Sequence, residues 1–249
     1  MLAEIAVLVS VGRHPASLRP RRADLDARAV ELALRLGGRV HLIHAGGTAE
    51  PALSEYLALG AERLTVLRTP PQSDVAPALI AHLQTLQPAL VLAGLRTEQG
   101  LGGGALPYAI AHGLGWPLAA AIADLALADG QAHLLQALPR GQRRALRAPL
   151  PLVATIDSTA PAPRLGAYAL ACHGSIEVRD AHAAAPPLPP LDELPAKRRP
   201  KRLQPPGQAR QAEQQQTERV KLLIDPHPQD AARAIYDYLI AEGILRRGR

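Results

Sequence analysis

The sequence predicts an α/β fold with a doubly wound, mostly parallel sheet, followed by an extended C-terminal arm and a terminal helix. Short apolar runs alternate with segments of helical periodicity in the first part of the chain, which is the pattern of a parallel sheet with crossover helices. Prolines and polar residues replace this alternation after residue 183. With 249 residues, 47% of them hydrophobic, the chain can bury a sizeable core.

Four apolar runs predict buried parallel strands, and each is followed by a segment with helical spacing. In the first such segment Leu25, Leu32 and Leu36 recur at helical intervals, and Gly37 ends the pattern. The strands are expected at residues 5–11, 39–44, 63–67 and 89–93, and the helices at residues 23–36, 51–59, 75–86 and 106–114.

The pattern changes between residues 118 and 156. Two short runs are separated by the turn pair Asp129-Gly130, and Arg140-Gly141 marks a second turn. These features predict a hairpin that feeds one last strand. The hairpin would extend the sheet with antiparallel strands at one edge. The runs are expected at residues 122–127, 133–138 and 152–156.

The tail is expected to be organised separately from the α/β domain. Its proline pairs preclude both helix and sheet pairing, and a short strand at 220–224 is expected before a helix at 229–242. That helix carries Ile235 and Leu239 on one face, and a lone amphipathic helix cannot bury its face locally, so it must dock. The parts are a domain at 1–183, a Pro/Gln-rich linker or arm at 184–218, and a docking strand and helix at 219–249.

Composition excludes several classes of protein. The chain has no Phe and one Trp, so it lacks the aromatic platforms of single-stranded nucleic-acid binders. A single cysteine, Cys172, excludes an internal disulfide and a multi-cysteine metal site. No apolar window is long enough to span a membrane, and the first residues do not resemble a secretory signal. A bacterial cytoplasm is therefore the expected compartment.

The net charge of +6 is concentrated in a basic run at 197–202 and at the C-terminus. A bias toward arginine in the source proteome explains this charge, and attraction to an acidic partner is the functional alternative. A nucleic-acid patch is less consistent with the sequence, because no aromatic or groove-reading element lies nearby.

The motifs of several enzyme classes are absent. There is no phosphate-binding loop with Gly-Lys-Ser/Thr, no nucleophile elbow and no His-Glu-x-x-His. Cys172 and His173 are neighbours on a segment expected to be extended, where adjacent side chains point in opposite directions. His41 and His44 could face a pocket, but isolated histidines on strands are more often structural. We therefore expect neither catalytic residues nor a metal site.

Open parallel sheets bind ligands at the carboxyl ends of their strands. The glycine-rich loop at 100–104 follows such a strand and precedes a helix, so its backbone N–H groups could approach a phosphate; a flexible turn is the alternative. The residues expected to surround a nucleotide are Ser10, Ala45, Gly94, Gln99, Gly100, Gly102, Gly103 and Gly104.

Several segments resemble, in order, the β subunits of electron-transfer flavoproteins. Residues 26–33, Asp-Ala-Arg-Ala-Val-Glu-Leu-Ala, resemble the family's Asp-Glu-x-Ala-x-Glu-x-Ala helix, and residues 58–63 resemble its step into the third strand. The resemblance runs from about residue 5 to residue 178. Its other segments are the strand 90–94 before the nucleotide loop, Gly115-Trp116-Pro117, the late strand 150–155, and Pro163-Arg164.

This resemblance implies a heterodimer in which an α subunit holds most of the FAD and the β subunit supports the flavin and often holds a structural AMP. His14 and Leu25 correspond to family positions that face the flavin. Electrons would pass from a donor dehydrogenase to a downstream quinone reductase. Tyr168 and Leu170 lie in the stretch that corresponds to the exposed anchor for dehydrogenases, and the tail is expected to bind the α subunit.

The sequence departs from the family at three places, which indicates a divergent branch. The first strand continues into Val11-Gly12-Arg13, where many members have Val-Lys-Arg. The acidic triplet of the nucleotide loop is missing from the segment around Thr97 and Glu98, which leaves AMP binding open. The stretch 165–174 is short and lacks lysines.

An adenine-nucleotide-binding protein without a redox role, on the same adenine nucleotide alpha hydrolase-like fold, is the alternative function. An ATP pyrophosphatase would need a Ser-Gly-Gly-x-Asp-Ser loop after the first strand, which is absent. A nucleotide-binding stress protein would need a hydroxyl residue after the third motif glycine, where this chain has Gly113-Leu114.

Overall fold

The computed structural model describes residues 3–14, 16–47, 51–70, 73–98, 103–181 and 226–244. The chain divides into two compact units, Met1–Leu191 and Asp192–Arg249, each of which is described by itself. The predicted arm at 184–218, with its basic run, and the predicted strand at 220–224 lie outside the described residues.

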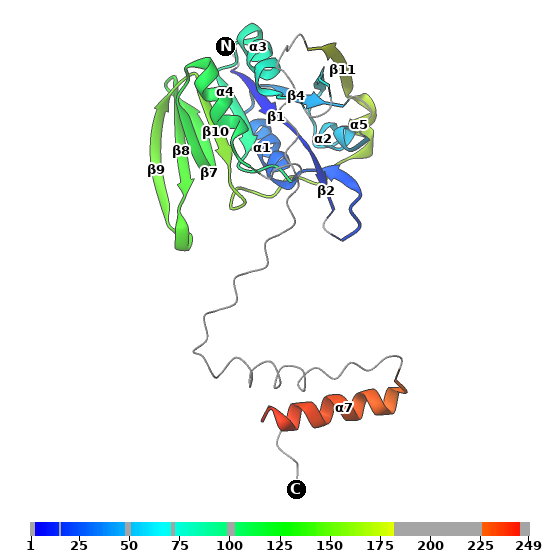
Figure 1. Cartoon of the computed structure of the whole chain (residues 1–249). Coiled ribbons are helices and arrows are strands. Elements are labelled where there is room, and N and C mark those ends of the chain that lie inside the picture. Colours follow the sequence, from blue (N-terminus) through cyan, green and yellow to red (C-terminus); the bar gives the residue numbers. More distant parts are fainter. Residues whose placement is uncertain are drawn as a thin grey trace, which may run out of the picture. The chain divides into compact units, whose positions relative to one another are not determined.

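Among the described residues of the first unit, nine strands form one sheet in the order β11-β5-β4-β1-β6-β10-β7-β8-β9 (Figure 1). The pairs from β11 to β7 are parallel. From β1 the chain runs to β4 and β5 on one side, then crosses to β6 on the other. The point where the strand order reverses therefore lies between β1 and β6. The core strands are β1 (Glu4–Leu8), β4 (Arg39–Gly46), β5 (Arg63–Arg68), β6 (Leu90–Gly94) and β10 (Leu152–Ile156).

Helices cover both faces of this sheet, as the predicted doubly wound fold requires. Along β1, Ile5 and Val7 pack in the cluster that contains α1, whereas Ala6 and Leu8 pack in the cluster that contains α3 and α4. Alternate strand residues thus serve opposite layers, which explains the continuous apolar run. The helices are α1 (Asp24–Arg35), α2 (Ser54–Leu57) after the short helix η1 (Pro51–Leu53), α3 (Ala76–Leu86) and α4 (Leu106–Leu114).

The antiparallel extension is confirmed, with one strand more than predicted. β7 (Leu118–Ala128) pairs antiparallel with β8 (Gln131–Ala137), which pairs with β9 (Arg143–Pro149) at the left edge of Figure 1. Asp129 and Gly130 both have positive φ, as a two-residue hairpin turn requires. The second turn contains the short helix η2 (Pro139–Gly141). The prediction missed β9 because charged and proline residues interrupt its apolar pattern.

Two further regions differ from the prediction. The first predicted strand, 5–11, is divided, because β2 (Val11–Arg13) pairs with β3 (Pro20–Arg22) in a separate projecting hairpin (Figure 1). The stretch after Pro163-Arg164 forms α5 (Tyr168–His173) and the edge strand β11 (Ser175–Asp180), parallel to β5. Cys172 and His173 therefore lie on a helix, so the extended geometry expected for them was wrong.

The second unit contains α7 (Pro228–Ala241), close to the predicted 229–242. Ile235, Tyr236 and Tyr238 are all about half exposed or more on this helix. No helix within the described ranges combines the length and apolar character that crossing a membrane requires.

Candidate functional site

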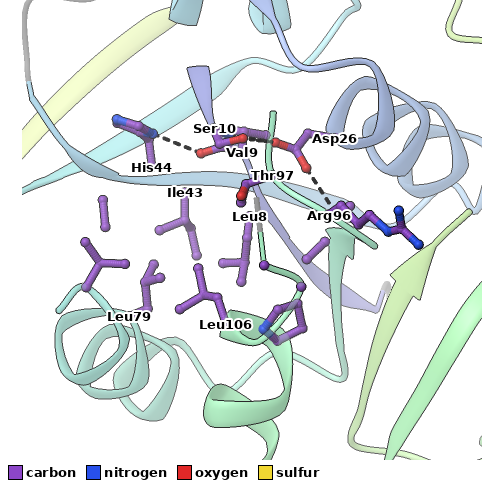
Figure 2. A pocket seen from close by; sticks show the side chains of 17 residues that line it. Leu8, Val9, Ser10, Asp26, Ile43, His44, Leu79, Arg96, Thr97 and Leu106 are labelled. Atoms are coloured by element: carbon purple, nitrogen blue, oxygen red, sulfur yellow. Dashed lines mark hydrogen bonds between the residues drawn. The ribbon is translucent and has the colours of Figure 1, made fainter. Parts of the chain in front are cut away.

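A pocket of about 180 Å³ opens where β1, β4 and β6 end, at the reversal of strand order. In Figure 2 the polar side chains of Ser10, Asp26 and His44 lie on one side, and Leu79 and Leu106 lie opposite them. The remaining wall comes from the starts of α3 and α4. A partly apolar cavity with a few convergent polar groups at this place is the usual ligand site of an open α/β sheet.

Five of the predicted nucleotide-binding residues line this one pocket, although they come from the ends of three different strands and from the loop before α4. They are Ser10, Ala45, Gly94, Gly103 and Gly104. Gln99, Gly100 and Gly102 lie outside the described residues. His14 and Leu25 do not line the pocket: His14 is exposed in the β2–β3 hairpin, and Leu25 is partly exposed in the first turn of α1.

Asp26 is a buried carboxylic acid of the pocket wall and is 5% exposed. Its Oδ2 accepts hydrogen bonds from Ser10 N at 2.8 Å and Ser10 Oγ at 2.5 Å, and its Oδ1 accepts from Gly94 N at 3.0 Å. Burial raises the pKa of Asp26 to about 6, although these hydrogen bonds oppose the shift. The carboxylate therefore ties together the loops that end β1 and β6.

Gly94 is required by this arrangement. A Cβ at residue 94 would overlap Asp26 Oδ1 and lie 2.9 Å from Leu25 Cβ. The glycine thus allows the end of β6 to approach the first turn of α1. Its role in the protein's own packing is sufficient to explain the residue, independently of any ligand.

Tyr56, which is fully buried, holds the same loop from the other side. Its hydroxyl donates to Ser10 O at 2.7 Å and accepts from Ala23 N at 2.8 Å. Burial raises the pKa of Tyr56 well above its usual value, so the hydroxyl stays protonated and remains a donor. Ser10 is consequently held at its amide, its hydroxyl and its carbonyl, and the β1 end of the pocket is preorganised.

Two features of the pocket wall suit an anion. Gly103 and Gly104 lead into α4, whose first residues line the wall, and Arg96 stands exposed at the margin. A helix N-terminus and a guanidinium both favour negative charge. A Cβ at Gly103 would meet nothing within 4 Å, whereas one at Gly104 would overlap Leu95 O.

The predicted dehydrogenase anchor lies away from the pocket. On α5, Tyr168 is 84% exposed and Leu170 is 44% exposed. The segment before α5 is attached to the domain through Arg164, whose Nε donates to the buried Glu31 Oε2 at 2.8 Å. Burial of Glu31 opposes ionisation, but hydrogen bonds from Arg164 and Arg35 prevail and lower its pKa to about 2. The exposed side chains therefore stand on a firmly attached base.

Sequence reasoning missed Asp26, Arg96 and Thr97 as pocket residues, and judged His44 more often structural. His44 is 7% exposed, with Nδ1 2.9 Å from Val9 O. Asp26 was noted only within the family's helix motif, although a carboxylate at a predicted buried helix face is a usable indication. In the described part of the chain, no cluster of three or more His, Cys, Asp or Glu side chains could hold a metal ion.

Comparison with known proteins agrees with this fold. Residues 18–185 match the family model described as the Electron transfer flavoprotein domain. The chain is also 42% identical over 261 aligned residues to the Electron transfer flavoprotein subunit beta of Chromohalobacter salexigens, and the match covers 98% of this chain and 96% of that protein. The family model matches more than half of the chain, and the similarity to the Chromohalobacter protein covers nearly all of it. This chain therefore belongs to the electron transfer flavoprotein family.

Proposed function

We propose that this chain is the β subunit of a heterodimeric electron transfer flavoprotein. It supports an FAD that the α subunit mainly holds, and it relays electrons from a dehydrogenase to a downstream acceptor such as a quinone reductase. The observation that carries this proposal is the 42% identity to a β subunit over nearly the whole of both chains. Family membership alone would leave the choice of subunit open.

The size of the pocket supports an FAD held mainly outside this chain. A cavity of about 180 Å³ is smaller than the few hundred Å³ usual for a small-molecule site, so FAD would not fit within it. The exposed His14 lies in the β2–β3 hairpin, and the partly exposed Leu25 lies at the start of α1. These two residues form the flavin-facing surface in our proposal, because they correspond to the family positions described above.

Two exposed apolar surfaces serve as docking sites in this proposal. Tyr168 and Leu170 on α5 would contact the donor dehydrogenase, and exposed tyrosines are frequent energetic centres of interfaces. Ile235, which is 60% exposed, and Leu239 on α7 would contact the α subunit as a helix in a groove. In this arrangement residues 1–183 are the working domain, 184–218 the arm and 219–249 the docking element.

The direct test is to produce the chain alone and together with its α-type subunit, and to record flavin absorbance of both. We expect the complex to retain FAD and the isolated chain to lack it. Flavin in the complex should be reduced by a cognate dehydrogenase. Stoichiometric FAD on the isolated chain, or a stable complex without flavin, would contradict the proposal.

An adenine-nucleotide-binding role without redox activity is the second candidate. The pocket at the strand ends favours it, because the start of α4 and Arg96 provide an anion-compatible end. The same pocket could hold AMP within the flavoprotein, so nucleotide alone does not separate the two functions. A chain that retains AMP or ATP but never forms a flavin-containing complex would support the second candidate.

A further inference from the structure

Glu98, in the loop after β6, reaches across to both the β2–β3 hairpin and α1. Its Oε1 accepts from Asp24 N at 2.9 Å and from Arg21 Nη2 at 3.1 Å, and its Oε2 lies 3.0 Å from the same guanidinium nitrogen. The side chain is 23% exposed. One carboxylate therefore joins the loop after β6 to the end of the β2–β3 hairpin and the start of α1, which lie 77 and 74 residues earlier in the chain.

Helix α1 needs this contact, because its own N-terminus carries no cap. Ala23 occupies the N-cap position and offers no side-chain acceptor. Glu98 accepts from the first helical amide, and Tyr56 accepts from the amide before it. A carboxylate at this place also interacts favourably with the helix dipole.

Gly12 of β2 makes room for the same carboxylate. A Cβ at residue 12 would overlap Glu98 Oε2, and would lie 2.9 Å from Glu98 Cδ and 3.0 Å from Ala23 Cα. The φ of Gly12 is not in the left-handed region, so the backbone itself does not require glycine. Glu98 thus occupies the space that a side chain at residue 12 would fill. Both residues lie in segments where the sequence departs from the family, Val11-Gly12-Arg13 and the loop after β6.

Arg21 shows that this arrangement holds the hairpin in one orientation. Its Nη2 pairs with Glu98 and its Nη1 donates to Arg22 O at 3.2 Å, while its Nε is buried with no hydrogen-bond partner among the described residues. Leaving a buried donor unsatisfied costs free energy. The ion pair with Glu98 offsets this cost and keeps the guanidinium at its buried position. An ordinary exposed ion pair would contribute little, but this one also provides the cap of α1.

We propose that Glu98, accommodated by Gly12, is a positioning residue that holds the β2–β3 hairpin, and with it His14, in the orientation that supports the flavin. The hairpin hydrogen bond from His14 N to Arg19 O, 2.9 Å long, lies beyond the anchored pair of strands. Without Glu98 the hairpin would keep its internal pairing but lose its attachment to the loop after β6. The flavin part of this inference rests on the proposed function, whereas the attachment of the hairpin does not.

The test uses the full chain in complex with its α subunit and compares Glu98→Ala, Gly12→Ala and the double variant. We expect Glu98→Ala to speed amide hydrogen exchange in residues 11–22 about tenfold and to raise the FAD dissociation constant by up to about tenfold. That is the size of effect expected for the loss of one charge-assisted hydrogen bond. Gly12→Ala should act similarly, because its Cβ displaces the carboxylate.

The double variant is the decisive comparison. If Gly12 and Glu98 act as one unit, the part of the Gly12→Ala effect that comes from displacing the carboxylate should vanish once Glu98 is absent, so the double variant should show less than the sum of the two effects. Only the part due to the 3.0 Å contact of the new Cβ with Ala23 Cα should remain. Glu98→Gln, which keeps an acceptor for Asp24 N but loses the ion pair, should lie between wild type and Glu98→Ala. The matched control is Glu177→Ala, which removes an exposed ion pair with Arg179 on β11 and should change neither measurement.

The outcomes separate this inference from the proposed function. A wild-type complex without flavin would refute the proposed function, and hydrogen exchange in the hairpin would still test the attachment by Glu98. Unchanged exchange in Glu98→Ala, or additive effects in the double variant, would overturn the inference even in a flavin-containing complex. Faster exchange together with an unchanged FAD dissociation constant and an unchanged flavin reduction potential would overturn its flavin part.

Discussion

The substitution Asp26→Asn tests whether the buried carboxylate at the pocket titrates as its surroundings require. Burial raises the pKa of Asp26 from 3.8 to about 6. Ionising this carboxyl therefore costs about 3 kcal/mol more in the folded chain than in the unfolded chain. Protonated Asp26 stabilises the folded chain. Because the folded pKa is the higher one, this contribution is fully present below pH 3.8 and is lost as the pH rises through about 6.

Between pH 7.5 and pH 5.0 the folded chain takes up a proton on Asp26, while the unfolded chain stays mostly ionised. This linkage adds about 1.4 kcal/mol to the wild-type free energy of unfolding. An asparagine does not titrate, so the stability difference between wild type and Asp26→Asn should shift by about 1.4 kcal/mol in favour of wild type over that interval.

Urea unfolding followed by far-ultraviolet circular dichroism at both pH values measures this shift, because contributions from the histidines cancel in the difference. Asp24→Asn, which removes a more exposed carboxylate from the same helical turn, controls for the loss of one acid. A stability difference between wild type and Asp26→Asn that is the same at both pH values would refute the reasoning.

Three further predictions concern the pocket and the docking surfaces. Gly103→Val should abolish nucleotide retention in acid extracts, because a branched side chain blocks the close approach of the backbone to a ligand. Folding should be unaffected, since a Cβ at this residue meets nothing within 4 Å. Ala145→Val on the exposed edge strand is the control, and extracts of wild type that contain no nucleotide would refute a retained AMP. Tyr168→Ala should slow flavin reduction by the donor in stopped-flow experiments while flavin content stays constant, because its side chain is 84% exposed; loss of flavin or of folding would instead favour a packing role. Deleting residues 219–249 should leave the first unit folded but weaken the heterodimer in gel filtration, and full co-purification at low and high salt would contradict this role of the tail.

The central strands were predictable because burial on both faces makes their residues apolar without interruption, and the helices because their apolar residues recur at helical spacing. β6, with all five residues buried, is the clearest case. The alternation in β11 was also available, since Ile176 and Val178 stand two residues apart.

The pocket was predictable in part, and for a definite reason. Parallel strands end at the same edge, so Ser10, Ala45 and Gly94 could be grouped without knowing any contact. The contacts of Asp26 and Glu98 could not be inferred, because their partners are distant in sequence. Asp26 binds residues 16 and 68 positions away, and Glu98 binds an amide 74 positions away. Local pattern carries no information about such pairs.

Helix α1 has a consequence for how the chain is made on the ribosome. Its first amide donates a hydrogen bond to Glu98, its Arg28 donates one to Ala160 O, and its buried Glu31 accepts one from Arg164. All three partners are translated long after the helix itself. A nascent chain that has not yet exposed residue 98 therefore carries a helix whose first amide lacks this acceptor, and until residue 164 emerges Glu31 is paired only with Arg35. The contacts of the N-terminal helix are therefore complete only after residues 160 and 164 have emerged, late in the synthesis of the first unit.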